Sequence, residues 1–208
     1  MKTNNFDAII FGRRSIRLYD DTVKIPREEM LAMIDEAVTA PSSVNMQPWR
    51  FVVVDSPEGK EKLAPLVGSN QTQNDTSSAM ILIFGDLQCY EYGQTIYDTA
   101  VDQGKMSADV RERQLSVIIP MYQSLTKEAM TSIVKVDASL AAMQLMLIAR
   151  AHGYDTNPIG GFDAEHLAET FGLDKERYVP VMILSIGQAK ETGHDSVRLR
   201  AETITSFM

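Results

Sequence analysis

Two continuous apolar runs limit this chain to a small set of architectures. The first covers Met80 to Gly85 and the second covers Val179 to Gly187. Each has the length of a strand, and neither shows the alternation of apolar and polar residues that marks a strand with one solvated face. We therefore expect a sheet that is covered on both faces, with the first run near its centre.

Weaker signals place the remaining elements around these two strands. Further strands are predicted over 50–55 and over 154–162, the second of which runs into a glycine turn. Helices are predicted at about residues 6–12, 26–39, 56–65, 138–152 and 163–172. Asp137 and Asp163 are the expected caps of the last two, and the polar stretch 68–78 is predicted to be a loop.

The 138–152 helix is apolar on almost all sides. Both of its faces should therefore be buried, one against the sheet and the other against a second subunit. Its most apolar run, Leu140 to Ala149, is too short to span a bilayer.

Two segments fall outside this pattern. Residues 90–131 are rich in Met, Gln and Tyr, and we interpret them as one or two excursion helices broken at Pro120. Residues 204–208 have the character of an edge strand, either on the chain's own sheet or on a partner's. The absence of a composition break predicts one α+β domain over residues 1–208, a sheet flanked by helices.

The net charge and the cysteine content argue against some classes of function and indicate a cellular compartment. A net charge of −8 argues against general affinity for nucleic acid or for anionic membranes. The chain opens without an apolar leader, and its single cysteine, Cys89, is consistent with a reducing cytoplasm. Cys89 has no histidine nearby in sequence, which favours a packing role over a catalytic one.

The segment Arg13–Arg17 places three arginines and a serine within five residues of an acidic protein. Guanidinium groups donate pairs of hydrogen bonds that match a phosphate, so this segment is a candidate phosphate site. Arg198, near the other end of the chain, could join it. The alternative for these arginines is a solvated basic turn, paired with carboxylates such as Asp20 and Asp21.

A stiff polar loop joins the 26–39 helix to the 50–55 strand. Pro41 and Pro48 restrict its two ends, and the only tryptophan follows it. Its side chains suit a polar, planar small molecule, although a well-built turn explains them equally well; they are Ser42, Ser43, Asn45 and Gln47. The pair Gly160–Gly161 has two similar interpretations, a tight turn or a close approach of backbone to a ligand.

Several other chemistries lack their signatures. The three histidines do not have metal-ligand spacing, so no metal site is predicted. The sequence also contains no nucleophile elbow, no P-loop and no dinucleotide-binding glycine fingerprint.

Three blocks, in order, resemble the FMN-dependent nitroreductase family: Arg13–Arg17, Ala40–Phe51 and Pro158–Asp163. The middle block is the most specific, and the likeness extends from Phe6 to the C-terminus. The resemblance implies a central, mostly antiparallel sheet flanked by helices, in an intertwined α+β homodimer with two FMN sites at its interface, each built from both chains. It also implies that the 90–131 excursion covers the substrate site.

Site residues follow from the resemblance by position. It implies FMN contacts from Arg13, Arg14, Ser15, Arg17, Pro41, Ser42, Ser43, Asn45, Asn70, Gln73, Pro158, Ile159, Gly160, Gly161 and Arg198. Arg13, Arg14 and Arg198 would hold the phosphate, while Arg17, Asn70 and Gln73 would lie near the pyrimidine edge. The 41–45 residues would come from the other subunit, and the 158–161 backbone would lie along the ring.

The implied reaction passes hydride from NADH or NADPH through FMN to a nitroaromatic, a quinone or a similar electron-poor acceptor, by a ping-pong mechanism. No side-chain acid or base is required, because the flavin carries the chemistry and the protein tunes it. Gly160 stands where some members carry Glu, so the preferred nicotinamide is left open. Alternatives are a flavin-storage or redox-sensing module, or a relative that dehalogenates aromatics or degrades flavin.

Overall fold

The computed structural model describes residues 2–208 and contains one antiparallel four-stranded sheet. The strand order is β1 (Trp49–Val54), β2 (Ala79–Asp86), β4 (Tyr178–Gly187) and β3 (Asp155–Ile159). The two apolar runs are therefore the two inner strands, and every residue of β2 is buried. The predicted α+β class with an antiparallel sheet is confirmed.

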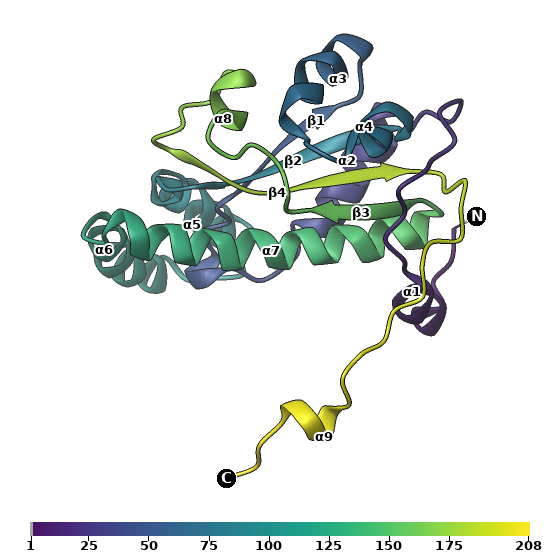
Figure 1. The fold of residues 1–208 in the computed structure, drawn as a ribbon. Helices are drawn as coiled ribbons and strands as arrows, with labels where there is room; N and C mark the ends of the chain where they lie inside the picture. Colours follow the sequence, from purple (N-terminus) through teal and green to yellow (C-terminus); the bar gives the residue numbers. More distant parts are fainter. Residues whose placement is uncertain (1) are drawn as a thin grey trace.

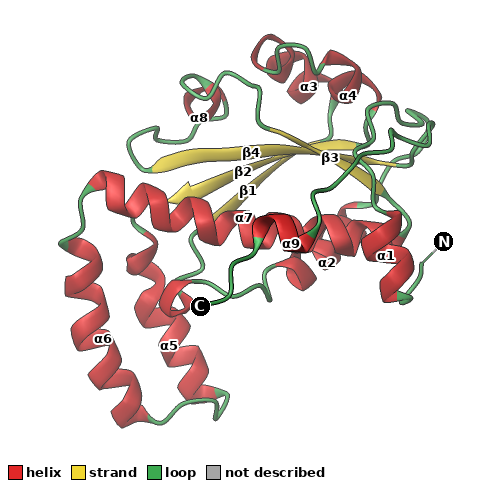
Figure 2. Cartoon of the chain, turned by 60° about the horizontal axis from the view of Figure 1, so that its bottom comes forward, coloured by secondary structure: helices red, strands yellow, loops and turns green. Residues whose placement is uncertain are grey.

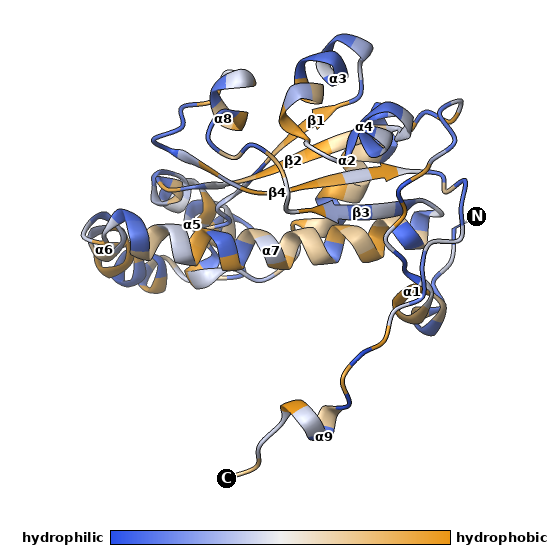
Figure 3. Ribbon diagram, viewed as in Figure 1, coloured by the Kyte–Doolittle hydropathy of each residue, from blue (hydrophilic) through white to orange (hydrophobic). Residues whose placement is uncertain are grey.

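Helices cover both faces of the sheet (Figure 1). On one face, α2 (Arg27–Ala37) and α7 (Lys127–His152) pack against side chains such as Ile81 and Leu184. On the other, α3 (Pro57–Leu63), α4 (Gln71–Thr76) and α8 (Leu167–Thr170) lie above the opposite side of the strands. The colouring in Figure 3 shows that β1, β2 and β4 are mostly apolar, that β3 is more hydrophilic, and that α7 carries many apolar residues along its length.

The long helix α7 differs from its predicted form. It begins at Lys127 rather than at residue 138, because the Thr126 side chain accepts a hydrogen bond from the N–H of Ala129 and caps it. Asp137 is therefore a buried mid-helix residue and not a cap. By length and composition alone, α7 could cross a membrane, so the prediction that the region is too short does not hold for the whole helix. Its packing on α2 and the sheet accounts for its apolar side chains.

The 90–131 excursion forms two helices that project from one end of α7, away from the sheet (Figure 2). A short 3-10 turn, Cys89–Tyr92, leads into α5 (Gly93–Asp102) and then α6 (Ala108–Gln123). Pro120 was predicted to interrupt a helix, but α6 continues through it, because Pro120 lies within the last turn and a half of that helix. There it removes only one backbone hydrogen bond close to the helix end.

Two other predictions are corrected, and the first of the two alternatives for the C-terminal tail is not observed in residues 2–208. The 68–78 stretch contains α4, a helix with few apolar residues to signal it. Asp163 accepts hydrogen bonds from the N–H groups of Glu165 and His166, and so forms a turn just ahead of α8 rather than its cap. The C-terminal tail carries the short helix α9 (Ala201–Ile204) away from the sheet, and no strand on the chain's own sheet is described for 204–208 (Figure 1).

Candidate functional site

Four arginines meet at a hollow of about 550 Å³ between the N-terminal segment and the start of the tail. The N-terminal helix α1 (Phe6–Gly12) ends directly before this segment. The arginines are Arg13, Arg14, Arg17 and Arg198, and Ser15, His194 and Asp195 also line the hollow. Arg13 and Arg14 thus lie beside Arg198, which follows Arg14 by 184 residues, so the three arginines predicted to bind phosphate meet in this hollow.

Two of these arginines are oriented by hydrogen bonds to neighbouring oxygen atoms. Arg14 Nη1 donates to the carbonyls of Phe11 and Arg13 at 2.8 and 3.0 Å, and its Nη2 lies 3.6 Å from the exposed Asp195. Arg198 Nη1 donates to Ser196 Oγ at 2.7 Å. Because guanidinium groups remain charged at any physiological pH, the hollow offers donors and positive charge to a phosphate.

The N-terminal segment lies along the outer edge of β3. Ser15 forms a parallel bridge with Thr156, and the N–H of Ile16 donates to the Thr156 carbonyl at 3.1 Å. Thr156 Oγ1 is buried and has no hydrogen-bond partner among the described residues. Pro158 and Ile159 end β3 and Gly160 and Gly161 follow them, so the arginine hollow, which Ser15 lines, lies near the start of this strand and the glycine pair follows its end.

Asn70 connects this edge to α4. Its Nδ2 donates to the Gly161 carbonyl at 3.1 Å, and its Oδ1 accepts from Gln73 Nε2 at 3.1 Å. Gln73 is buried, so in this chain its amide orients Asn70. A Cβ at Gly160 or Gly161 would meet no heavy atom of residues 2–208 within 4 Å. The space above this backbone is therefore open to a flat ligand.

The side chain of Ile159, by contrast, packs in the core beneath this surface. Of its atoms, only the backbone can contribute to a site at this edge. The hollow, the backbone edge and the Asn70 amide together fit a ligand that combines a phosphate with a planar polar ring.

The 41–48 loop has an unusual backbone. Val44, Asn45 and Gln47 have φ angles of 43°, 57° and 46°, in the left-handed region. A β-branched residue such as Val44 is rarely found there, and each such residue costs about 1–3 kcal/mol. Within the loop, Ser42 Oγ accepts from the N–H of Gln47 at 3.0 Å, and Ser43–Asn45 form a 3-10 turn. Surrounding groups must stabilise this geometry.

Side chains from the three helices α5, α6 and α7 contact this loop. Tyr97 donates to the Val44 carbonyl at 3.0 Å, Tyr122 donates to the Ser43 carbonyl at 3.3 Å, and Asp137 accepts from the Ser43 N–H at 3.0 Å. Burial raises the pKa of all three side chains above their ordinary values. None of these three side chains was predicted from the sequence to contact the loop. The one available signal was an ionisable residue, Asp137, inside an apolar helix.

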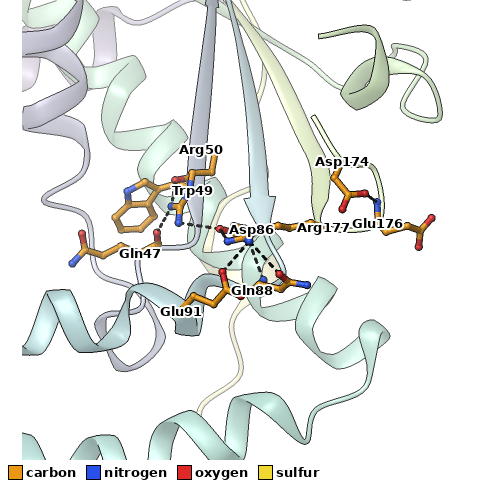
Figure 4. A network of polar contacts seen from close by, with 9 residues as sticks. All are labelled: Gln47, Trp49, Arg50, Asp86, Gln88, Glu91, Asp174, Glu176 and Arg177. Carbon is orange, nitrogen blue, oxygen red and sulfur yellow. Dashed lines mark hydrogen bonds and ion pairs between the residues drawn. The ribbon is translucent and has the colours of Figure 1, made fainter. Parts of the chain in front are cut away.

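An ion network holds the other end of the loop (Figure 4). Arg50 Nη1 donates to the Gln47 carbonyl at 2.9 Å, and its Nη2 lies 3.0 Å from Asp86 Oδ2. Arg177 binds both oxygens of the same carboxylate at 2.8 and 3.0 Å. Asp86 is fully buried, and the hydrogen bonds and charge of its carboxylate raise the pKa of Arg177. This network fixes the start of β1 and, through Gln47, the end of the loop.

The loop and the arginines of one chain lie far apart. The loop adjoins Asp86, at one end of β2, because the N–H of Asp86 donates to the Pro48 carbonyl. Thr156, beside the arginines, pairs with Ile186, which in turn pairs with Ala79 at the other end of β2. At about 3.3 Å per residue, these two ends are roughly 23 Å apart, and the loop and Thr156 also lie at opposite edges of the sheet. The predicted site residues thus form two separate groups in a single chain.

Other reactive groups do not contribute to the site. Cys89 is buried, and burial raises its thiol pKa to about 12, so the nucleophilic thiolate is scarce at neutral pH. Among residues 2–208, no cluster of three His, Cys, Asp or Glu side chains could hold a metal ion.

Comparisons with known proteins agree with this geometry. A family model described as the Nitroreductase family matches residues 10–188. The chain is 56% identical to the Bacillus subtilis protein named "Putative NAD(P)H nitroreductase YdgI", over 100% of this chain and 99% of that one. It is 39% identical to the "CLA biosynthesis enone reductase" of Lactiplantibacillus plantarum, over 99% of this chain and 95% of that protein.

A solved structure extends the agreement to the fold. It is the structure from Exiguobacterium sibiricum described as a "putative nitroreductase in complex with FMN". The TM-score is 0.98 and the identity is 52%, over 100% of this chain and 99% of that chain.

Proposed function

This chain belongs to the nitroreductase family, and on that premise we propose that it is an oxidoreductase that uses FMN to pass hydride from NADH or NADPH to electron-poor acceptors. The observation that carries the proposal is the placement of the four-arginine hollow near the start of β3 and of the open glycine pair after its end. A relative of 52% identity is described in complex with FMN, which supports the choice of cofactor.

Different residues of the chain would bind different parts of FMN. Arg13, Arg14 and Arg198 hold the phosphate, Arg17 and Asn70 approach the pyrimidine edge, and the 158–161 backbone lies along the ring. When bound, FMN supplies the hydride chemistry by accepting two electrons from the nicotinamide and passing them to the acceptor. The arginines provide positive charge and the glycine pair permits close backbone approach, in keeping with a ping-pong sequence in which donor and acceptor use the same surface in turn.

The active form in this proposal is a homodimer, and the 41–45 loop of one chain completes the flavin site of the other. The distance between the loop and the arginines within one chain supports this arrangement. So do the apolar side chains that one chain leaves exposed on α7, where Val136, Leu140 and Met143 are between 39% and 62% exposed.

In this proposal the C-terminal tail of each chain also binds the sheet of its partner. β1 is an edge strand, and a hollow of about 380 Å³ beside it is lined by Ile25, Leu31 and Val53. Residues 204–208, with the exposed Phe207 and Met208, would add a strand to this edge of the partner's sheet. A cytoplasmic location, with a single domain over 1–208, completes the proposal.

Nitroaromatics and quinones are the acceptor class proposed first, because a flavin surface without a required side-chain acid suits acceptors that take electrons readily. A second class is conjugated enones, favoured by 39% identity over nearly the whole length to a protein named as an enone reductase.

The test is a visible spectrum of the purified protein, followed by anaerobic addition of NADH or NADPH. The proposal predicts a yellow protein that bleaches and then recovers on addition of a quinone, a nitroarene or an enone. A yellow protein that neither nicotinamide bleaches would favour flavin storage, sensing or breakdown. A colourless protein that does not take up FMN would overturn the proposal.

A further inference from the structure

The strained 41–48 loop is held in part by the excursion that was expected only to cover substrate. Tyr97 lies on α5 and Tyr122 on α6, and each hydroxyl donates to a loop carbonyl, of Val44 at 3.0 Å and of Ser43 at 3.3 Å. Both tyrosines are buried, in a cluster that also contains the side chain of Met46. The excursion is therefore packed against the loop as well as hydrogen-bonded to it.

Asp137 adds a third contact from α7. Its carboxylate accepts the Ser43 N–H at 3.0 Å, so Ser43 is bonded at both its N–H and its carbonyl. Together with the Tyr97 bond to the Val44 carbonyl, these bonds lie on both sides of Val44 and directly before Asn45, two of the three residues with left-handed φ. A backbone in that region persists only where its surroundings determine it, and such geometry concentrates at functional sites.

We propose that Tyr97, Tyr122 and Asp137 are positioning residues for the flavin held by the other subunit. They fix the loop in the conformation in which Ser43 and Asn45 face that flavin. In consequence, the α5–α6 excursion of one chain builds part of the flavin site whose arginines belong to its partner. This inference rests on the proposed function.

The first test compares hydroxyl deletions. The double variant Tyr97→Phe/Tyr122→Phe keeps both rings and removes both loop bonds. Tyr154→Phe is the matched control, because its hydroxyl donates at 2.9 Å to Glu29, on α2 and outside the loop. With two bonds lost, we expect FMN to dissociate about tenfold faster from the double variant, followed by the recovery of free-flavin fluorescence. The control should remain within about twofold of wild type.

Asp137 offers a separate test by conservative rescue. Asp137→Asn retains an oxygen that can accept the Ser43 N–H, whereas Asp137→Ala leaves that group without its partner. We expect Asp137→Ala to release FMN faster and to shift the flavin absorption bands, and Asp137→Asn to recover most of both properties. Equal behaviour of the two variants would contradict a positioning role for this carboxylate.

A mixed dimer shows whether the two tyrosines affect the flavin of their own chain or that of the partner. One chain carries Arg13→Ala/Arg14→Ala and the other carries Tyr97→Phe/Tyr122→Phe, with two affinity tags to isolate the heterodimer. If the tyrosines serve the partner's flavin, the one competent site combines intact arginines with intact tyrosines and releases FMN at the wild-type rate. If they serve their own chain's flavin, the FMN that binds will leave at the fast rate, which overturns the inference.

The outcomes separate this inference from the proposed function. A wild-type protein that does not bind FMN would refute the proposed function. A wild-type protein that binds FMN, with a double variant whose release rate and flavin spectrum are unchanged, would refute the positioning role alone.

Discussion

The carboxamide of Asn70 donates a hydrogen bond of 3.1 Å to the carbonyl of Gly161, and so joins two segments 91 residues apart. The same amide accepts from the buried Gln73 at 3.1 Å, which fixes its orientation. Gly161 is thus held by its carbonyl, while the side where a Cβ would stand is open. A methyl group added at Gly161 should therefore leave the stability of the fold unchanged while it affects any ligand that lies against this backbone.

The first prediction concerns Gly161→Ala. The added methyl meets no heavy atom of the described residues within 4 Å, and the φ angle of Gly161 is not left-handed, so the free energy of unfolding of the apoprotein should change by less than about 0.5 kcal/mol. If the backbone lies against the flavin, the Kd for FMN should rise about tenfold or more. Equilibrium titration by flavin fluorescence and urea unfolding measure the two quantities.

Gly85→Ala is the contrasting control, since a Cβ there would overlap the side chain of Val134 on α7. It should lower the free energy of unfolding by about 1–3 kcal/mol. Unchanged FMN affinity in Gly161→Ala, with the expected loss of stability in Gly85→Ala, would show that the glycine backbone does not contact the flavin.

The second prediction concerns Arg17→Ala. Arg17 lines the same hollow as Arg13 and Arg14, but we assign it to the pyrimidine edge rather than to the phosphate. Losing one charge-assisted hydrogen bond to the reduced ring, worth about 1.4 kcal/mol, should lower the two-electron reduction potential by roughly 30 mV. Reduction by NADH or NADPH should slow more than FMN binding weakens. Spectroelectrochemical titration measures the potential.

Arg198→Ala serves as the comparison, because that arginine is assigned to the phosphate. It should weaken FMN binding and leave the potential of the bound flavin near its wild-type value. An Arg17→Ala protein with the wild-type potential would remove Arg17 from the flavin ring.

The third prediction concerns pH. Burial raises the pKa of Asp137, and the hydrogen bond from the Ser43 N–H offsets only part of that effect. The folded chain therefore binds this proton more tightly than the unfolded chain. Between the ordinary pKa of Asp, about 3.9, and the raised value, the contribution of Asp137 to the free energy of unfolding falls as pH rises.

The matching measurement is urea unfolding of wild type and Asp137→Asn across this pH range. The difference in unfolding free energy, wild type minus variant, should decrease with rising pH and become constant above the raised pKa. Taking the difference cancels other carboxylates, including Asp155, whose pKa burial also raises. A difference that does not vary with pH would show that Asp137 titrates normally.

Local patterns were sufficient to predict the sheet and one half of the site. The apolar runs of β2 and β4 are signals contained within each strand, and the arginine block is five residues long. Arg198 was a candidate for the same phosphate from its residue type, the family resemblance assigned it there, and the structure brings Arg13 and Arg198 to one hollow.

The missed features depend on contacts distant in sequence. Asp137 resembles a helix cap in sequence, but its carboxylate bonds to Ser43, 94 residues away, and α7 continues through it. Tyr97 and Tyr122 carry no local mark of their contacts, which are 53 and 79 residues away. The helix α4 was missed because its buried side chains are amides, Gln73 and Asn74, rather than apolar groups.

The last prediction concerns Asp86. Its fully buried carboxylate lies between Arg50 and Arg177, with ion-pair distances of 2.8 to 3.0 Å. Asp86→Asn would leave two guanidinium groups partly buried without their counter-charge, which should cost about 3–5 kcal/mol in the free energy of unfolding. Glu176→Gln is the control, because Glu176 pairs with Lys127 at 2.7 Å on the exposed surface and should change stability by less than about 1 kcal/mol. Since Arg50 also holds the Gln47 carbonyl, the Asp86 variant should release FMN faster as well, whereas the control should not. A loss of stability no greater than that of Glu176→Gln, measured by urea unfolding of the apoprotein, would show that neighbouring groups compensate the two arginines without the carboxylate charge.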